Sequence, residues 1–201
     1  MQRILVPFIF CLFIITGNGQ VDLVQKYNAV NLHPPMKIDM VLSGNFGELR
    51  SNHFHTGIDI KTYGREGYGM YAITEGHVSR IKISPWGYGK AIYIDHPNGL
   101  TTVYAHCSSF PEKIQKFIEK AQYQLQKSSI DLYPGEFELP VKKGEIIAYS
   151  GNSGSSHGPH LHFEIRDTKS EDPLNPLLFN FDIEDNISPS IEGIYLYSLS
   201  P

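Results

Sequence analysis

The sequence contains little cysteine. Its 201 residues include two cysteines, and one of them, Cys11, lies in an apolar N-terminal segment. If that segment is removed, Cys107 is left alone and no disulfide within the chain is possible. The stability of the fold must then come from a hydrophobic core or from a bound metal ion.

The sequence also lacks a strong excess of either charge. The formal net charge is −4, which is small and has the wrong sign for a nucleic-acid partner. Hydrophobic residues make up 41% of the chain and charged residues 19%, which suits one globular domain with a sizeable core. With 12 Tyr, 11 Phe and 18 Gly, the composition favours a β-rich domain over a helical bundle.

A third absence is that of a long hydrophobic run. Residues 4–15 (ILVPFIFCLFII) are apolar, but they are too few to cross a bilayer comfortably, which takes about 20 residues. Arg3 precedes this run and small residues follow it up to Gly19, as in a signal peptide. We therefore predict a signal peptide over 1–19, a periplasmic or secreted location, and no stable membrane span after cleavage. An uncleaved anchor is the alternative.

The segment 150–166 (SGNSGSSHGPHLHFEIR) contains a His-x-His pair. Residues 160–165 alternate between polar and apolar side chains, which predicts a strand. On a strand, His160 and His162 share one face and lie roughly 6.6 Å apart. One imidazole can therefore bind a metal while the other stands beside it. The alternative is the polar face of an ordinary strand.

A second motif, HTGID, lies upstream at residues 55–59. Gly57 between two β-branched residues argues against a helix there. In a straight strand, His55 and Asp59 would be about 13 Å apart, too far for one metal ion. We therefore expect the chain to bend between them at Gly57.

The remaining pattern predicts further strands and one helix. We expect a strand pair over 71–83 with a turn or bulge at Gly76, a loop over 86–89, a hairpin formed by 90–96 and 100–106, a loop over 131–140 and a strand over 145–150. Residues 110–127 have an apolar stripe at helical spacing. This helix is expected to pack on the sheet or, alternatively, to border the functional site.

Cys107 follows His106 directly, which raises the alternative of a thiol-protease dyad. On a strand, however, adjacent side chains point to opposite faces. We therefore interpret Cys107 as a small buried hydrophobic residue.

The two motifs together suggest a catalytic zinc site. Such a site uses three nitrogen or oxygen ligands and keeps one position open for water. His55, Asp59 and one of the paired histidines would supply the three ligands and leave the ion with a net charge of about +1. The remaining histidines would then transfer protons or stabilise the transition state.

Three segments carry a resemblance to a known family: FGELRSNHFHTGIDI, TTVYAH and SGNSGSSHGPHLHFEI. Together, over residues 42–165, they resemble the lysostaphin/LytM-type zinc metallopeptidases, which cut bacterial cell-wall peptides. The resemblance implies one Zn²⁺ per chain, held by His55, Asp59 and His162, with His106 and His160 as catalytic residues. It does not decide which of these two is the general base.

The resemblance also implies a fold and a function. The fold would be mainly β, an antiparallel-sheet groove of the barrel-sandwich hybrid type with one inserted α-helix. The protein would be a secreted zinc-dependent endopeptidase that hydrolyses peptide cross-links of peptidoglycan, with a metal-bound water as nucleophile and peptidoglycan stem peptides as partners. The alternative is a non-catalytic LytM-like activator or cell-wall binding protein.

The sequence departs from the family pattern in two places. His157 stands where family members more often have a small hydroxyl residue, and a helical insertion occupies about 108–140. We interpret the Gly-rich loop over 151–158 in two ways. Its glycines let the backbone approach a peptide substrate closely, or it is an ordinary turn before a strand. The other histidines are expected to be surface or core residues, and these are His33, His53, His77 and His96.

We divide the chain accordingly. Residues 1–19 form the signal peptide and 20–41 an extended lead-in, because a Pro-Pro pair there disfavours helix. Residues 42–180 form the metallopeptidase domain. Residues 181–201 begin a further β-domain or serve as an edge strand.

Overall fold

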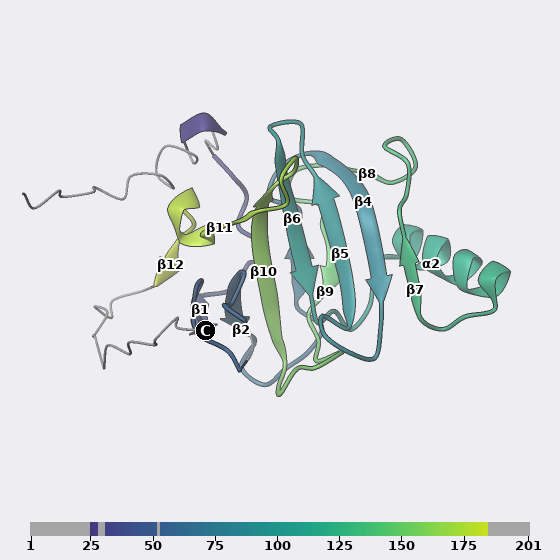
Figure 1. Cartoon of the computed structure of the whole chain (residues 1–201), viewed down its shortest axis with the longest axis horizontal. Coiled ribbons are helices and arrows are strands. Elements are labelled where there is room, and N and C mark those ends of the chain that lie inside the picture. The colour runs from purple at the N-terminus through teal and green to yellow at the C-terminus, as the bar shows by residue number, and fades with distance from the viewer. Residues whose placement is uncertain (1–24, 28–30, 52, 185–201) are drawn as a thin grey trace, which may run out of the picture.

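The computed structural model describes residues 25–27, 31–51 and 53–184. These residues form two sheets, with a long helix, α2 (Glu112–Leu125), at one side (Figure 1). The larger sheet has the order β12-β1-β2-β10-β6-β5-β4-β7, with β11 beside β10 and β8 beside β4. Apart from the parallel pair of β1 and β12, its strands pair antiparallel. The predicted mainly β fold with an inserted helix is confirmed.

The strands have the following bounds. The larger sheet contains β1 (Met40–Gly44), β2 (Ile58–Lys61), β4 (Gly76–Ile83), β5 (Lys90–Asp95), β6 (Leu100–Ala105), β7 (Ile130–Leu132), β8 (Pro140–Val141), β10 (His160–Asp167), β11 (Pro173–Leu174) and β12 (Ile183–Glu184). The smaller sheet pairs β3 (Gly69–Tyr71) with β9 (Ile146–Tyr149), and a 3₁₀ helix, η1, covers Pro176–Phe179.

Strand β10 lies between β2 and β6, and it has one face toward the core and one polar face. Its apolar residues Leu161, Phe163 and Ile165 are fully buried in the main hydrophobic cluster. That cluster also contains residues of the smaller sheet, such as Met70 and Ile147, so the core lies between the two sheets. The polar residues of β10 therefore face away from the core, as the alternating pattern predicts.

Two predicted regions differ from the structure. Residues 71–83 do not form a strand pair, because β3 pairs with β9 and β4 pairs with β5. Gly76 is the first residue of β4, where a Cβ would lie 2.3 Å from the carbonyl oxygen of Asp95. Its role is thus close approach of two strands. The predicted loop over 131–140 includes the end of β7 and the first residue of β8, and both strands pair with β4.

Helix α2 packs against the core through Ile114 and Ile118, which are buried. Its last turn lies outside the core, since Tyr123 and Leu125 are exposed. The helix lies beside β7, on the opposite side of the sheet from β1 and β2 (Figure 1). The structure therefore supports the packing alternative for this helix and not a position bordering β2 and the start of β10.

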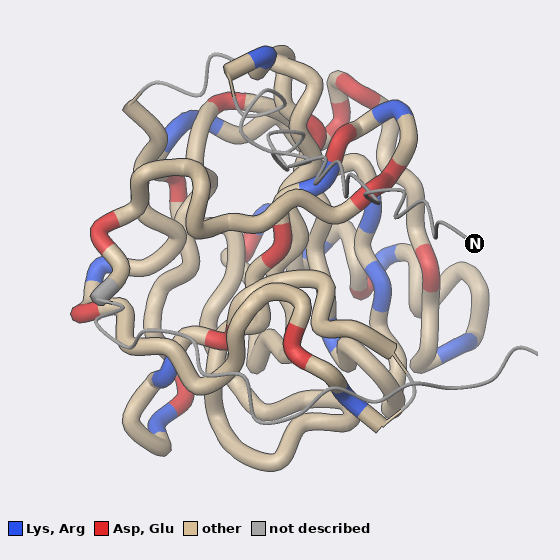
Figure 2. The backbone as a smooth tube through the Cα atoms, turned by 60° about the vertical axis from the view of Figure 1, so that its left-hand side comes forward, with Lys and Arg blue, Asp and Glu red and all other residues tan. Residues whose placement is uncertain are grey.

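The described part of the lead-in packs against β3. The Tyr71 amide donates to the Pro35 carbonyl at 2.9 Å, and Met36 forms a bridge with Met70 in the core. The predicted signal peptide and most of the C-terminal tail lie outside the described residues, and the predicted domain boundaries stay predictions. None of the helices in the described part has the length and apolar character needed to cross a membrane. Basic and acidic residues are interspersed along the backbone (Figure 2).

Gly57 lies between the two predicted ligands His55 and Asp59. The chain bends at this residue, as predicted, and it passes very close to β10. A Cβ at position 57 would lie 2.2 Å from the carbonyl oxygen of Phe163 and 2.8 Å from Cγ of Glu164. Glycine is therefore required here because any side chain would push β2 away from β10.

We expect Gly57→Ala to lower the free energy of unfolding by about 1–3 kcal/mol, because the methyl group overpacks a tight contact. Gly135→Ala is the matched control, since a Cβ there would meet only the Glu138 side chain at 3.5 Å or more. The control should change stability by less than about 0.5 kcal/mol. Equal denaturant midpoints for the two variants would contradict this explanation of Gly57.

Candidate metal centre

Three buried side chains bring their donor atoms together. His55 Nε2 lies 3.1 Å from Asp59 Oδ1 and 3.0 Å from His162 Nδ1, and His162 Nδ1 lies 3.0 Å from Asp59 Oδ1. All three donors fall within 4.8 Å of one another and could hold a metal ion. Two imidazoles and one carboxylate are a donor set that suits zinc. The structure thus places the three predicted ligands at one point.

Sheet register accounts for this convergence. Asp59 on β2 lies directly opposite His162 on β10 in the antiparallel pair, so their side chains emerge on the same face. His55 arrives from the segment before β2, where its amide donates to the Glu48 carbonyl at 2.8 Å. The bend at Gly57 then turns its ring toward the two strand residues.

Each of the three side chains is held by its other polar atom. His55 Nδ1 is 2.8 Å from the Asn45 carbonyl, and Arg50 donates to Asp59 Oδ2 at 3.0 Å. His162 Nε2 is 2.7 Å from Glu164 Oε1. Such contacts orient the ring or carboxylate and leave one atom of each free for a metal.

Glu164 is fully buried beneath His162. Its second oxygen accepts from Arg166 Nε at 2.6 Å, and its first accepts from Thr56 at 2.7 Å and from the Tyr88 hydroxyl. Burial disfavours the charged carboxylate, but the bond from His162 and the charges of His162 and Arg166 outweigh it and lower the pKa of Glu164 to about 2. The carboxylate therefore stays ionised inside the protein.

Two further histidines stand beside the three donors. His106 Nδ1 lies 2.8 Å from the Ser153 carbonyl, and His160 Nδ1 lies 2.8 Å from the Gly158 carbonyl. A carbonyl only accepts, so Nδ1 of each ring carries a proton and donates it, and Nε2 is the acceptor nitrogen when the ring is neutral. The ring centroids are 4.7 Å apart, and His160 Nε2 is 3.5 Å from Asp59 Oδ1. Both rings can reach the same reacting group.

The charges of the centre follow from burial and pairing. Burial opposes ionisation of Asp59, but hydrogen bonds from His160, His162 and His55 hold its pKa far below the usual range. Burial also disfavours a charged His162, yet its bonds to Asp59 and Glu164 raise its pKa to about 9. Burial lowers the pKa of His106 to about 4, against the opposing bond to Ser153, so this ring is neutral at neutral pH.

Several functional contacts were not anticipated from the sequence. Glu164 had a visible signal, because it continues the polar alternation of His160 and His162 on β10. Arg50 had none, since its pairing with Asp59 depends on the fold of the segment before β2. Gly44 leaves room for this pair, because a Cβ there would lie 2.4 Å from the Arg50 guanidinium.

The cysteine and the other histidines considered in the sequence analysis are not part of the three-donor group. Cys107 is fully buried, and burial raises the pKa of its thiol to about 12, which fits a hydrophobic role. His96 is buried between the Glu75 carbonyl and Thr102. His53 is exposed, and the three-donor group contains His55 in its place.

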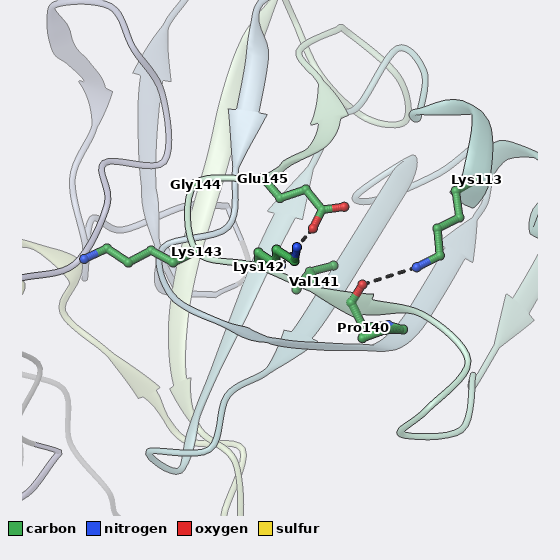
Figure 3. A pocket seen from close by; sticks show the side chains of 7 residues that line it. All are labelled: Lys113, Pro140, Val141, Lys142, Lys143, Gly144 and Glu145. Carbon is green, nitrogen blue, oxygen red and sulfur yellow. Dashed lines mark hydrogen bonds between the residues drawn. The ribbon is translucent and has the colours of Figure 1, made fainter.

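A surface hollow of about 570 Å³ lies elsewhere, between α2 and the turn after β8 (Figure 3). It is lined by Lys113 and residues 140–145. Figure 3 shows Lys143 pointing away from Lys113, and Glu145 accepts from the Lys142 amide at 2.8 Å. Its lining includes none of the histidines and acids of the candidate metal centre.

Comparison with known proteins identifies relatives. The model of peptidase family M23 matches residues 53–123 and 126–176. The DD-carboxypeptidase/endopeptidase Mpg of Neisseria meningitidis is 33% identical over 129 residues, which are 64% of this chain and 23% of that protein. An uncharacterized metalloprotease of Haemophilus influenzae is 33% identical over 55% of this chain and 18% of its own length. The chain thus spans about a fifth of the length of these curated relatives.

Solved structures agree with this result. Csd3 of Helicobacter pylori is 30% identical, covers 81% of this chain and 35% of its own, and superposes with a TM-score of 0.51. The catalytic domain of the prophage-encoded M23 protein EnpA from Enterococcus faecalis, solved as a mutant, is 25% identical. It covers 71% of this chain and 93% of its own, with a TM-score of 0.51.

Metal uptake should be coupled to proton release. His162 has a pKa of about 9 without metal, so below that pH its Nδ1 carries a proton that a metal ion must displace. The apparent zinc affinity should therefore rise about tenfold per pH unit between about pH 6 and pH 8. Titration calorimetry in buffers of different ionisation enthalpy should show about one proton released per ion at neutral pH. A pH-independent affinity would contradict this charge assignment.

Glu164→Gln should weaken zinc binding by about 10- to 100-fold, because the neutral amide cannot accept from both His162 and Arg166. Chelator competition measures this change. Glu112→Gln, which alters an exposed ion pair at the start of α2, is the control and should bind zinc as the unchanged protein does. Equal affinities for all three proteins would show that Glu164 does not orient His162.

Proposed function

The chain belongs to peptidase family M23, and on this basis we propose that it is a zinc-dependent endopeptidase that hydrolyses peptide cross-links of bacterial peptidoglycan. The observation that carries the proposal is the convergence of five side chains. Three donors, His55, Asp59 and His162, lie within 4.8 Å of one another, and two histidines, His106 and His160, stand beside them. The relative Mpg is named as a DD-carboxypeptidase/endopeptidase, which supports the choice of substrate.

The donor set fits zinc. His55 Nε2, Asp59 Oδ1 and His162 Nδ1 would hold the ion, and these three protein ligands leave a fourth position for solvent or substrate. When bound, zinc supplies a Lewis acid that polarises a carbonyl and lowers the pKa of water. Two neutral ligands and one anion would leave the ion with a net charge of about +1, which this role needs.

His106 and His160 carry the proton transfers. Each donates Nδ1–H to a backbone carbonyl, which fixes the ring and presents Nε2. One of the two accepts a proton from the attacking water at Nε2. The other would carry a proton at Nε2 as well as at Nδ1, and with that proton it stabilises the developing oxyanion or protonates the leaving amine. The low pKa of His106 keeps it in the form that accepts a proton at neutral pH.

The cellular place of the protein follows from the substrate. Peptidoglycan lies outside the cytoplasmic membrane, and the predicted signal peptide would deliver the chain there. We therefore propose a periplasmic or secreted location.

The lead-in residues before β1 pack against β3 on the core side, while the five side chains emerge on the opposite face of β10.

The role assignment is tested by two substitutions. Asp59→Ala should abolish zinc retention, because it removes the only anionic donor of the three. His106→Ala should keep the metal but lower turnover of cross-linked muropeptides by about 100- to 10,000-fold, the usual contribution of a proton-transfer group. His77→Ala, on β4 away from the site, is the control. Metal analysis and product chromatography on the same preparations give both readouts.

The opposite pattern, metal lost in His106→Ala and retained in Asp59→Ala, would overturn the assignment. Chelator should stop cleavage by the unchanged protein, and added zinc should restore it. Full zinc occupancy without cleavage of any muropeptide would instead favour the alternative, a non-catalytic activator or cell-wall binding protein.

A further inference from the structure

Trp86 is the one tryptophan of the sequence, and its side chain is 76% exposed. Exposure alone means little, because single apolar side chains are common on protein surfaces. What distinguishes Trp86 is its surroundings. It lies in the loop over 84–89 between β4 and β5, and the same loop carries Tyr88, whose ring centroid is 5.0 Å from that of His162.

The loop is held in one conformation by short backbone contacts. The Trp86 amide donates to Ser84 Oγ at 3.1 Å, and the Gly89 amide donates to the Trp86 carbonyl at 3.2 Å. The Gly87 amide donates to Ser155 Oγ at 3.0 Å, and the Ser155 amide donates back to the Gly87 carbonyl at 2.8 Å. An indole on such a loop loses little conformational entropy when it binds a ligand.

Glycines make this contact between the two loops close. A Cβ on Gly154 would lie 2.3 Å from the Gly87 carbonyl oxygen, and one on Gly89 would lie 2.4 Å from the Ser153 backbone. Ser153 also provides the carbonyl that accepts from His106. The loop of Trp86 is therefore joined to the segment that orients His106.

We propose that Trp86 is a substrate-binding residue that packs against aliphatic groups of the stem peptide beside the bond that is cleaved. This inference rests on the proposed function. Exposed, rigid aromatic side chains are typical anchors of binding sites, because an indole provides a large apolar surface with two torsions to fix.

Trp86 lies close to the candidate metal centre along the chain. The Cα atoms of Trp86 and Tyr88 can be at most about 7.6 Å apart, twice the spacing of consecutive residues. A substrate residue in extended form spans about 3.3–3.6 Å, so the backbone at Trp86 lies within about two substrate residues of the backbone at Tyr88, whose ring is next to His162. The groups next to the cleaved bond belong to the stem peptide, and a contact at this range is therefore made to the peptide.

Tryptophan emission gives a direct test, because Trp86 is the sole tryptophan of the sequence and can be excited at wavelengths where tyrosine does not absorb. We would titrate zinc-loaded His106→Ala protein with a synthetic cross-linked stem-peptide dimer that carries no sugar. The peptide should change the emission saturably and protect the indole from acrylamide quenching. The Trp86→Phe protein should give no signal, and a disaccharide-bearing dimer should protect no better than the peptide.

Kinetics give the second test. Trp86→Ala should raise KM for the same peptide by about 10-fold or more, with kcat within about twofold, because the contact contributes to binding and not to chemistry. Trp86→Phe should retain most of the affinity. Phe137→Ala, which removes an aromatic side chain 88% exposed in the helical insertion, should leave both constants unchanged.

The two proposals can fail separately. Emission that responds to the peptide while the unchanged protein cleaves nothing would support Trp86 and refute the endopeptidase. Cleavage by Trp86→Ala with an unchanged KM, or emission that no peptide alters, would overturn the role of Trp86. Protection by the disaccharide-bearing dimer alone would also overturn it, in favour of a glycan contact.

Discussion

The register between β2 and β10 is the constraint on which the centre depends. It places His162 opposite Asp59, and a slip of one residue would turn the histidine into the core and bring Leu161 to the polar face. The register is secured by the apolar side of the same strand, where Leu161, Phe163 and Ile165 are fully buried. Core packing on one face therefore determines the geometry of the site on the other.

Buried charge is the second feature that shapes the molecule. Glu164 has no exposed surface, and a carboxylate in such a place is stable only when it is paired and hydrogen-bonded. His162 and Arg166 meet this need from either side along β10. The same contacts fix the His162 ring, so the groups that make the buried acid tolerable also orient a candidate ligand.

His106 and His160 lie at the ends of elements. His106 follows the last residue of β6 with a φ of 59°, and His160 begins β10. Each is held by a carbonyl of the segment between β9 and β10. This arrangement, with reactive side chains on connections held by a rigid sheet, lets the chemistry be placed without disturbing the core. Helix α2 of the insertion lies beside β7, at the other edge of the sheet from β1 and β2 (Figure 1).

The sequence by itself determined the mainly β fold, the β5–β6 hairpin and the approximate extent of α2, because period-two alternation, a Pro-Asn-Gly turn and a helical apolar stripe are local signals. It also identified His55, Asp59 and His162 as a candidate group, through spacing and a family resemblance. Only the tertiary structure decided that β3 pairs with β9, that β7 extends the sheet, and that Arg50 and Glu164 hold the candidate ligands. Strand partners and buried ion pairs join residues far apart in the chain, so no local pattern encodes them.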